Sequence, residues 1–349
     1  MEKLVIGIDF SKETVNYFCF DGRIENFLIE GVVENSVAGC KEMIRQLRSL
    51  KPGIRVRDFL FCGENTGFYS LTVSDYLYAK KYFIWLENPL QIKLSSGLRR
   101  EKTDKADARM IAEYALRYQD KARAYNPNSQ SIQKLKGWLK AHNTLRDSKT
   151  ALANVISTMP EVPATLKKAL EEIKEQLKET DKQIKKLLET DEELAPNAKL
   201  IISVPGISYI SAAAFLIDTR NFTRFSDARK YANHAGCVPH RHESGTSIYK
   251  NPRTSKASNR CINSLLTEGA RSLMTHNKET QEYVRKKTQE GKCQQTIVNN
   301  VRNKIIHRMF AVIRDRVPFD KDYINNSWRN EMKDAHIACQ VRERPLKIG

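Results

Sequence analysis

The sequence predicts an α/β domain at the N-terminus, a helical arm after it and a mainly α-helical domain at the C-terminus. Short apolar runs alternate with helix-spaced segments up to about residue 120, long charged helical sequence fills residues 126–196, and Arg- and Lys-rich helical sequence follows. A chain of 349 residues is too long for one ordinary hydrophobic core. We therefore expect four parts, with boundaries at 1–122, 123–196, 197–318 and, for a polar tail, 319–349.

The N-terminal domain opens with three predicted strands. The apolar run at residues 3–10 is typical of a buried strand, and residues 14–20 and 24–30 flank Asp21-Gly22, a dipeptide typical of hairpin turns. We expect these three strands to pair antiparallel. Helices and strands then alternate, with helical spacing at 36–50, 69–78 and 106–118 and short strands at 59–62 and 82–86.

A heptad pattern marks the second half of the predicted arm. Its positions step alternately by four and three residues and are apolar except for one threonine: Leu166, Leu170, Ile173, Leu177, Thr180, Ile184 and Leu187. A similar stripe precedes it, and Met159-Pro160 breaks the helix between the two. The simplest interpretation is an antiparallel helical hairpin with coiled-coil packing. We favour a structural arm or dimerisation spacer over direct contact with nucleic acid.

The charge of the chain indicates a polyanionic partner. It has 59 Lys and Arg residues against 41 Asp and Glu residues, a formal charge of +18 that is spread over most of the length. Nucleic acid is the commonest partner of such a chain, although a membrane surface or the ribosome would also attract it. The seven cysteines include no C-x-x-C pair, so we expect neither structural zinc nor a disulfide framework.

The N-terminus begins with a predicted strand rather than a signal peptide. No apolar run in the sequence is long enough to span a bilayer. We therefore expect a cytoplasmic protein with no membrane partner.

Four carboxylates form the candidate site. Asp9 and Glu64 each end an apolar strand, where a carboxylate is costly to desolvate unless it is paired, hydrogen-bonded or bound to metal. Asp104 and Asp107 stand three residues apart near the start of a predicted helix, which places both on one face. Taken alone, this pair is also compatible with helix capping. Taken together, the four acids can hold two Mg²⁺ or Mn²⁺ ions about 3.5–4 Å apart and act on phosphodiesters.

Four short blocks contain or flank these acids: GIDFSK at 7–12, GENTG at 63–67, ENP at 87–89 and KTDKADA at 102–108. Together they resemble the motifs of DEDD-type insertion-sequence transposases, the family of the RNA-guided bridge recombinases and the Piv-type DNA invertases. The resemblance implies a RuvC-like, ribonuclease-H-like fold for the N-terminal domain, which agrees with the predicted strand order.

The sequence after the arm resembles the same family. The matching blocks are VPGI at 204–207, YANHAG at 231–236 and Pro239, so the resemblance covers roughly residues 3–315 and implies a C-terminal transposase domain. An amphipathic pattern at 296–316 predicts its closing helix.

The resemblance also implies a serine that attacks DNA. The matching position is Ser244, which stands before a glycine, with Ser247 as the near alternative. The chain departs from the family pattern Ser-Lys-x-Gly-Asn, because Ser258 stands where the glycine is expected, and this puts the local turn in doubt rather than the chemistry. His240 and His242 flank the site and could take a proton or touch phosphate, but we favour solvated loop residues.

The resemblance implies a DNA transposase or recombinase with a covalent phosphoserine intermediate. It further implies donor and target DNA, a noncoding guide RNA, a dimer that pairs into a tetramer, and a place at the nucleoid of a bacterial or archaeal cell. Basic residues near the proposed chemistry are expected to contact phosphates: Arg99, Lys102, Arg241, Lys250, Arg253 and Lys256.

Three other classes of protein remain open. A Holliday-junction resolvase or other structure-specific nuclease would use the same acids without the serine. A sugar kinase or actin-like ATPase begins with a similar strand, but Phe10-Ser11-Lys12 supplies no glycine-rich phosphate loop. A non-enzymatic nucleic-acid scaffold would show no metal-dependent strand transfer.

Overall fold

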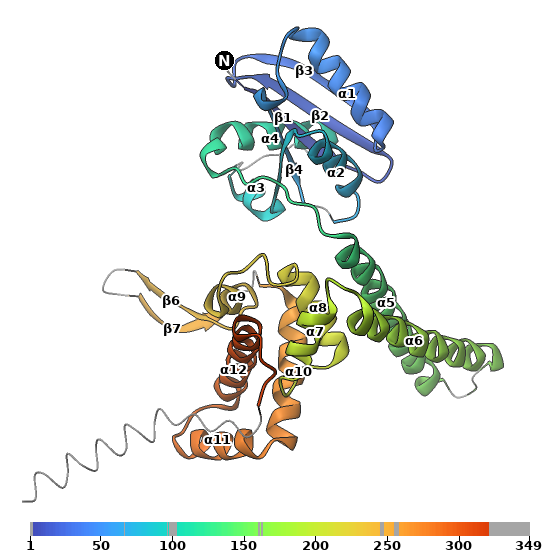
Figure 1. Ribbon diagram of the computed structural model, residues 1–349, viewed down its shortest axis with the longest axis vertical. Coiled ribbons are helices and arrows are strands. Elements are labelled where there is room, and N and C mark those ends of the chain that lie inside the picture. Colours follow the sequence, from blue (N-terminus) through green and yellow to red (C-terminus); the bar gives the residue numbers. More distant parts are fainter. Residues whose placement is uncertain are drawn as a thin grey trace, which may run out of the picture. The chain divides into compact units, whose positions relative to one another are not determined.

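The computed structural model describes residues 3–65, 67–95, 97, 103–159, 161, 163–244, 248–254 and 258–320. The chain forms two compact units, Met1–Pro127 and Asn128–Gly349 (Figure 1). The predicted polar tail, 319–349, lies outside the described residues beyond residue 320. Within the described ranges, no helix is long and apolar enough to cross a membrane.

A five-stranded sheet is the centre of the first unit. In spatial order its strands are β3 (Phe27–Glu34), β2 (Thr14–Asp21), β1 (Leu4–Phe10), β4 (Phe59–Glu64) and β5 (Phe83–Glu87). The first three strands pair antiparallel, as predicted, and β4 and β5 add to β1 in parallel. The third strand begins later than expected because residues 22–26 form the turn, closed by the Asp21 N–H donating to the Asn26 carbonyl at 2.8 Å. This mixed sheet with helices on both faces is consistent with a ribonuclease-H-like domain.

Helices cover the two faces of the sheet. They are α1 (Val37–Leu50), α2 (Leu71–Ala79), α3 (Pro89–Ser95) and α4 (Asp104–Arg117). Alternate residues of each strand enter opposite cores: Phe61 packs with Met43 of α1 on one face, whereas Cys62 packs with Ile111 of α4 on the other. The sheet is therefore buried on both sides, which explains the continuous apolar runs of β1 and β4.

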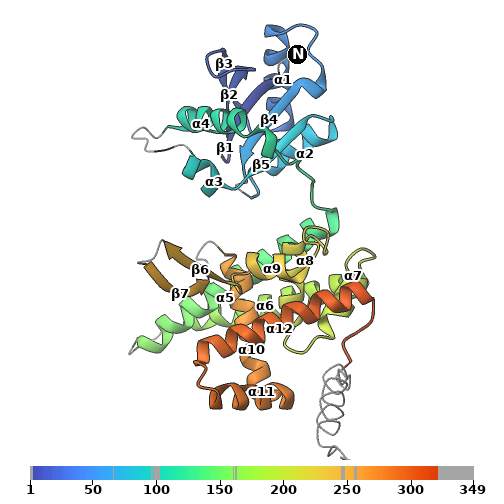
Figure 2. The same ribbon diagram turned by 90° about the vertical axis from the view of Figure 1, so that its left-hand side faces the viewer.

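Helix α4 lies unusually close to β1 (Figure 2). A Cβ atom placed on Gly7 would lie 2.2 Å from the Ala108 carbonyl oxygen and 2.3 Å from the Ala112 nitrogen. Any side chain at position 7 would collide with the helix backbone, so glycine is required here by space rather than by backbone angle. Ala108 and Ala112 supply the small residues on the helix side of the contact, and both are buried.

The second unit begins with two long helices that lie side by side, α5 (Gln130–Thr158) and α6 (Ala164–Thr190) (Figure 1). The predicted break falls between them. Their fully buried residues are confined to one end of the pair, with Ile132 and Leu135 of α5 near Ile184 and Leu188 of α6. Thr180 occupies its heptad position without an unpaired hydroxyl, because that group donates to the Leu177 carbonyl at 2.8 Å.

The rest of the second unit is helical except for one β-hairpin. The helices are α7 (Ala195–Ile202), α8 (Tyr209–Thr219), α9 (Ala228–His234), α10 (Arg260–His276), α11 (Lys278–Gln289) and α12 (Gln294–Asp315). The apolar face predicted for 296–316 is buried in α12, at Ile297, Val301, Ile305 and Met309. The hairpin, β6 (Pro239–Ser244) and β7 (Ile248–Thr254), was not predicted from the sequence.

The contact between Gly7 and α4 can be tested by substitution. Gly7→Val is expected to lower the free energy of unfolding of the first unit by about 3 kcal/mol or more, because the new side chain would overlap backbone atoms that have nowhere to move. Urea denaturation followed by circular dichroism measures the change. Gly137→Ala is the matched control: no atom lies within 4 Å of a Cβ there, and alanine in the middle of α5 should stabilise the helix by about 0.5–1 kcal/mol. A Gly7→Val protein as stable as wild type would contradict the close approach.

Candidate functional site

Two parallel strands deliver carboxylates to the same edge of the first sheet. In β1 the odd-numbered residues face α4, since Val5 packs with that helix and Gly7 touches it, and this alternation places Asp9 on the same face. In β4, Leu60 and Cys62 pack towards α4, and Glu64 continues that row. Both acids stand near the C-terminal ends of their strands. Because β1 and β4 are parallel, these ends lie at the same end of the sheet.

Helix α4 brings the other two carboxylates to the same place. Its N-cap is Thr103, whose hydroxyl accepts from the Ala106 N–H at 3.2 Å. Asp104 is therefore the first helical residue rather than the cap, and the capping explanation of the acid pair does not apply to it. Asp107 follows one turn later, next to Ala108 in the contact with Gly7. The close docking of α4 thus fixes the height of the acid pair above the sheet.

The electrostatics of the four acids show that they share one environment. The pKa of Asp9 is raised to about 6, mainly by burial and then by the charges of Asp107, Asp104 and Glu64, in that order. Burial and the Asp107 carboxylate likewise raise the pKa of Glu64. The cluster is therefore a place where negative charge is crowded and partly desolvated, which a cation would relieve.

Carboxylate oxygens are the donors that Mg²⁺ and Mn²⁺ prefer, so the chemistry of the cluster fits such an ion. Across the residues that the structure describes, however, no three His, Cys, Asp or Glu side chains are arranged around a point where a metal ion would sit. The acids converge on one region without forming a finished coordination shell. Which ion binds, and how many, therefore belongs to the proposal below.

Glu87 is a fifth carboxylate beside the cluster, and the sequence reasoning did not single it out. It ends β5 in register with Glu64, and Trp85, two residues before it, packs on the α4 side. Its two oxygens accept from the Tyr114 hydroxyl at 3.2 Å and from the Asn88 N–H at 2.7 Å. The signal was present in the sequence, because Glu87 ends a strand parallel to β4 just as Glu64 does.

The predicted serine lies in the second unit. Ser244 is the last residue of β6 and pairs with Ile248, the first residue of β7, so its backbone stands at the far end of the two strands. His240 is exposed and pairs with Arg253, and His242 pairs with Lys250. The histidines and three of the predicted phosphate contacts are therefore strand residues of the same hairpin, not loop residues. Arg241 lies at an irregularity in the β6 register between His240 and His242.

The remaining predicted site residues fall outside the described part of the chain. They are Ser247, the alternative nucleophile, and three basic residues: Arg99, Lys102 and Lys256. The four acids belong to one compact unit and Ser244 to the other.

Comparison with known proteins finds two family models that match successive parts of the chain. A transposase family model for DEDD transposases of IS110 type matches residues 6–159, and a model described as the transposase IS116/IS110/IS902 family matches residues 198–285. The first match contains the four acids, and the second contains Ser244.

The chain is also similar to individual proteins of this kind. It is 26% identical over 328 residues to a pilin gene-inverting protein of Moraxella bovis, which covers 92% of this chain and 99% of that protein. The pilin gene-inverting protein of Moraxella lacunata matches equally well. An uncharacterised 43.6 kDa protein of insertion element IS110 from Streptomyces coelicolor is 26% identical over 169 residues, covering 48% of this chain and 40% of that protein.

Two family models in the expected order, and relatives that match along nearly the whole chain, agree with the carboxylate cluster and the strand order of the first unit. The chain belongs to the IS110 family of DEDD transposases and is a DNA transposase or recombinase.

Proposed function

We propose that this protein cuts and rejoins DNA strands through a covalent phosphoserine intermediate, with Ser244 as the nucleophile and the four acids of the first unit as the metal-binding half of the site. The observation that carries the proposal is the grouping of four carboxylates, Asp9, Glu64, Asp104 and Asp107. The charges of the other three raise the pKa of Asp9. The second matched region contains Ser244, which supplies the nucleophile, while the acids of the first unit supply the metal ligands.

The four acids would hold divalent cations, Mg²⁺ or Mn²⁺ and on our proposal two of them. When bound, such ions lower the pKa of a coordinated hydroxyl and neutralise charge on the phosphate. The chain's own part is to present carboxylate oxygens from β1, β4 and α4 at one place. Glu87, held by Tyr114 and by the Asn88 N–H, would lie behind Glu64 as an outer residue that orients the acids.

The proposed reaction is a transesterification. The Ser244 oxygen forms a bond to the phosphorus of one phosphodiester, the bond from that phosphorus to one sugar oxygen breaks, and the proton lost by the serine ends on the released sugar hydroxyl. The reverse step, with a sugar hydroxyl of another strand, frees the serine and joins the strands. No phosphodiester energy is lost, which distinguishes recombination from hydrolysis by water.

The partners follow from the same proposal. The substrate is DNA, in donor and target form, and the formal charge of +18 favours its binding through phosphates. On the hairpin, Arg241, Lys250 and Arg253 are the proposed phosphate contacts, because they lie on the strands that lead to and from Ser244. We further propose that a noncoding guide RNA selects the sites, and that the paired helices α5 and α6 serve as a coiled-coil arm that holds a dimer or tetramer together.

The nucleophile can be tested by trapping the intermediate. With Mg²⁺ and radiolabelled donor DNA, wild-type protein is expected to become covalently labelled, whereas Ser244→Ala should lose the label and lower recombination by at least about 1000-fold. Denaturing gel electrophoresis detects the adduct, and Ser247→Ala is the matched control. Strand cleavage that persists in Ser244→Ala would favour the resolvase-like alternative, and loss of the label only in Ser247→Ala would move the nucleophile to that residue.

The different roles proposed for Glu64, a metal ligand, and Glu87, an outer residue, give a second test. Glu64→Gln is expected to abolish recombination and the thermal stabilisation caused by Mn²⁺, because it removes a proposed ligand. Glu87→Gln should weaken Mn²⁺ affinity only by about tenfold, the effect typical of an outer residue. Tyr114→Phe removes the hydroxyl that donates to Glu87 and should resemble Glu87→Gln. Equal effects of the two glutamine variants on Mn²⁺ binding would contradict the ranking.

The crowding of negative charge predicts that repulsion among the carboxylates lowers the free energy of unfolding of the metal-free protein. In EDTA at pH 7.5, Asp9→Asn should raise the free energy of unfolding. The raised pKa of Asp9, about 6, sets an upper bound of about 3 kcal/mol, and solvent screening of this partly exposed group reduces the expected gain to on the order of 1 kcal/mol.

The sign of the pH dependence follows from the same pKa. The folded state binds the Asp9 proton more tightly than the unfolded state does, so wild type loses stability relative to Asp9→Asn as the pH rises from about 4 to 6, and the difference is constant above that range. Denaturation across this range measures it. Asp58→Asn is the control of opposite sign, because Arg55 donates to Asp58 at 2.9 Å and holds the pKa of that carboxyl below its usual value. A wild-type protein more stable than Asp9→Asn in EDTA would contradict the crowding.

A further inference from the structure

The β6–β7 hairpin leaves the helical body and returns to it at a single point. Helix α9 ends at His234 before the hairpin, and Asn259 caps α10 after it. These two residues meet, because the Asn259 N–H donates to the His234 carbonyl at 3.3 Å. The hairpin therefore extends from a closed base whose two ends touch.

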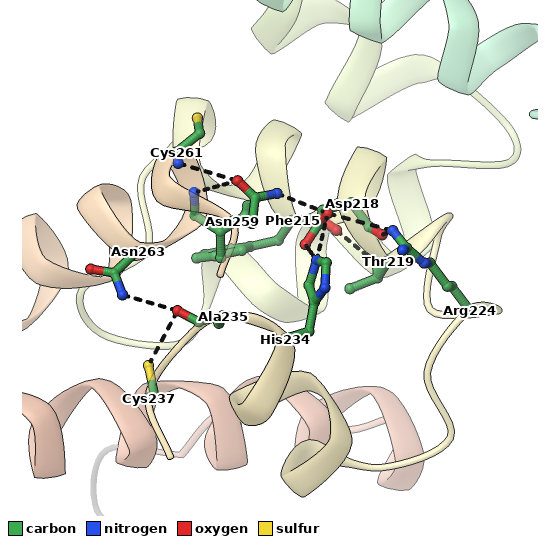
Figure 3. Close-up of polar contacts among 11 residues, drawn as sticks. Phe215, Asp218, Thr219, Arg224, His234, Ala235, Cys237, Asn259, Cys261 and Asn263 are labelled. Atoms are coloured by element: carbon green, nitrogen blue, oxygen red, sulfur yellow. Dashed lines mark hydrogen bonds and ion pairs between the residues drawn. The ribbon is translucent and has the colours of Figure 1, made fainter. Parts of the chain in front are cut away.

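One carboxylate joins both ends of this base (Figure 3). Nε2 of His234 lies 3.1 Å from each oxygen of Asp218, a residue of α8, and the Asn259 amide donates to Asp218 Oδ1 at 3.1 Å. Arg224 adds an ion pair at 3.7 Å. The Asp218 side chain is only 11% exposed, so three donors converge on a largely desolvated acceptor. A carboxylate can accept all of them, whereas an amide in its place would offer a donor to other donors.

Further contacts fix the chain just inside the base. The Asn263 amide of α10 donates to the Ala235 carbonyl at 3.0 Å, and the amides of Asn299 and Asn303 of α12 donate to the Cys237 carbonyl at 2.8 and 3.1 Å. These bonds hold the body side of β6. Asp218 differs from them in that it belongs to a third element, α8, and binds one residue on each side of the hairpin.

The chain is also closely packed at the base of the hairpin. Gly236 has a φ of +70°, and a Cβ atom there would lie 2.5 Å from the Cβ and Oγ atoms of Ser258. The strands of a lone two-stranded hairpin are marginally stable, so the direction in which β6 and β7 point depends on what holds their base. A small rotation at the base moves the far ends of β6 and β7, and with them the backbone of Ser244, by a larger distance.

We propose that Asp218 is a positioning residue, a latch that closes the base of the hairpin by binding His234 before it and Asn259 after it, and so holds Ser244 in the place where it reacts. The last clause rests on the proposed role of Ser244; the latch itself does not. Catalysis by an oriented nucleophile is sensitive to displacements of about 1 Å. Loosening the latch is therefore expected to slow the chemical step more than it weakens DNA binding.

The exchange of an acid and an amide tests the latch in the full-length protein. Asp218→Asn opposes the amide of Asn259 with a second amide, and Asn259→Asp opposes the carboxylate with a second carboxylate. Asn259→Asp keeps the oxygen that accepts from the Cys261 and Ile262 N–H groups, so the cap of α10 survives. In the double variant the new amide at position 218 can donate to the new carboxylate at position 259, which restores the contact with the roles reversed.

Two measurements separate positioning from general stability. Hydrogen exchange followed by mass spectrometry should show each single variant exchanging the β6–β7 amides about tenfold faster, and the double variant recovering most of that loss. The rate of phosphoserine formation on saturating donor DNA should fall about tenfold in each single variant at an unchanged Kd for DNA, and recover in the double variant. Asn277→Ala, which removes the cap of α11 in the same unit, is the control: it should lower the melting temperature without changing hairpin exchange.

The outcomes are distinguishable. Unchanged exchange of the hairpin amides in both single variants, or a double variant no better than the worse single one, would overturn the latch. If the exchange data follow the prediction while Ser244→Ala still forms the adduct, the latch stands and the assignment of the nucleophile fails.

Discussion

The site depends first on the absence of one side chain. Gly7 lets the backbone of α4 lie against β1, with Ala108 and Ala112 on the other side of the contact. A larger residue at any of these positions would lift the helix from the sheet, and Asp104 and Asp107, which occupy its first turn, would lift with it. The same contact that brings the acids together also removes water from around them. The raised pKa of Asp9 is thus a direct consequence of helix packing.

Much of the first unit could be predicted because its signals are local. Continuous apolar runs identify strands buried on both faces, and the turn at Asp21-Gly22 identifies the first hairpin. Asp9 and Glu64 were found because each breaks an apolar run at its end. Glu87 was overlooked although it ends its strand in the same way, because the strand was predicted at 82–86 and Glu87 fell just beyond it. The sequence also left open whether the acid pair caps α4, since Thr103 and Asp104 are both good capping residues and only the fold decides between them.

The second unit was less predictable for a physical reason. Its helices carry regular apolar spacing, and the two long helices and α12 appear where the pattern predicts them. The strands β6 and β7 are instead rich in His, Arg, Lys and Pro and lack the alternation of a half-buried sheet. Their position comes from contacts distant in sequence, such as the one between Asp218 and Asn259. A single sequence contains no periodicity that reports such a contact.

The carboxylates of the two units have opposite surroundings: those of the first unit face one another, whereas Asp218 of the second faces hydrogen-bond donors. This difference bears on how the proposed reaction is controlled. The acids of the first unit repel one another and gain most when a cation and a phosphate arrive together, since the cation neutralises them and the phosphate needs the cation. The base of the hairpin in the second unit is already satisfied, with His234, Asn259 and Arg224 around one carboxylate. The carboxylate cluster would therefore be completed only when a cation binds, whereas the base of the hairpin is held by contacts that the structure already contains. If Ser244 is the nucleophile, the protein cannot attack DNA with either half alone. On that proposal the nucleophile and the metal ligands stand on separate units, and cleavage would require an assembly in which both reach the same phosphate.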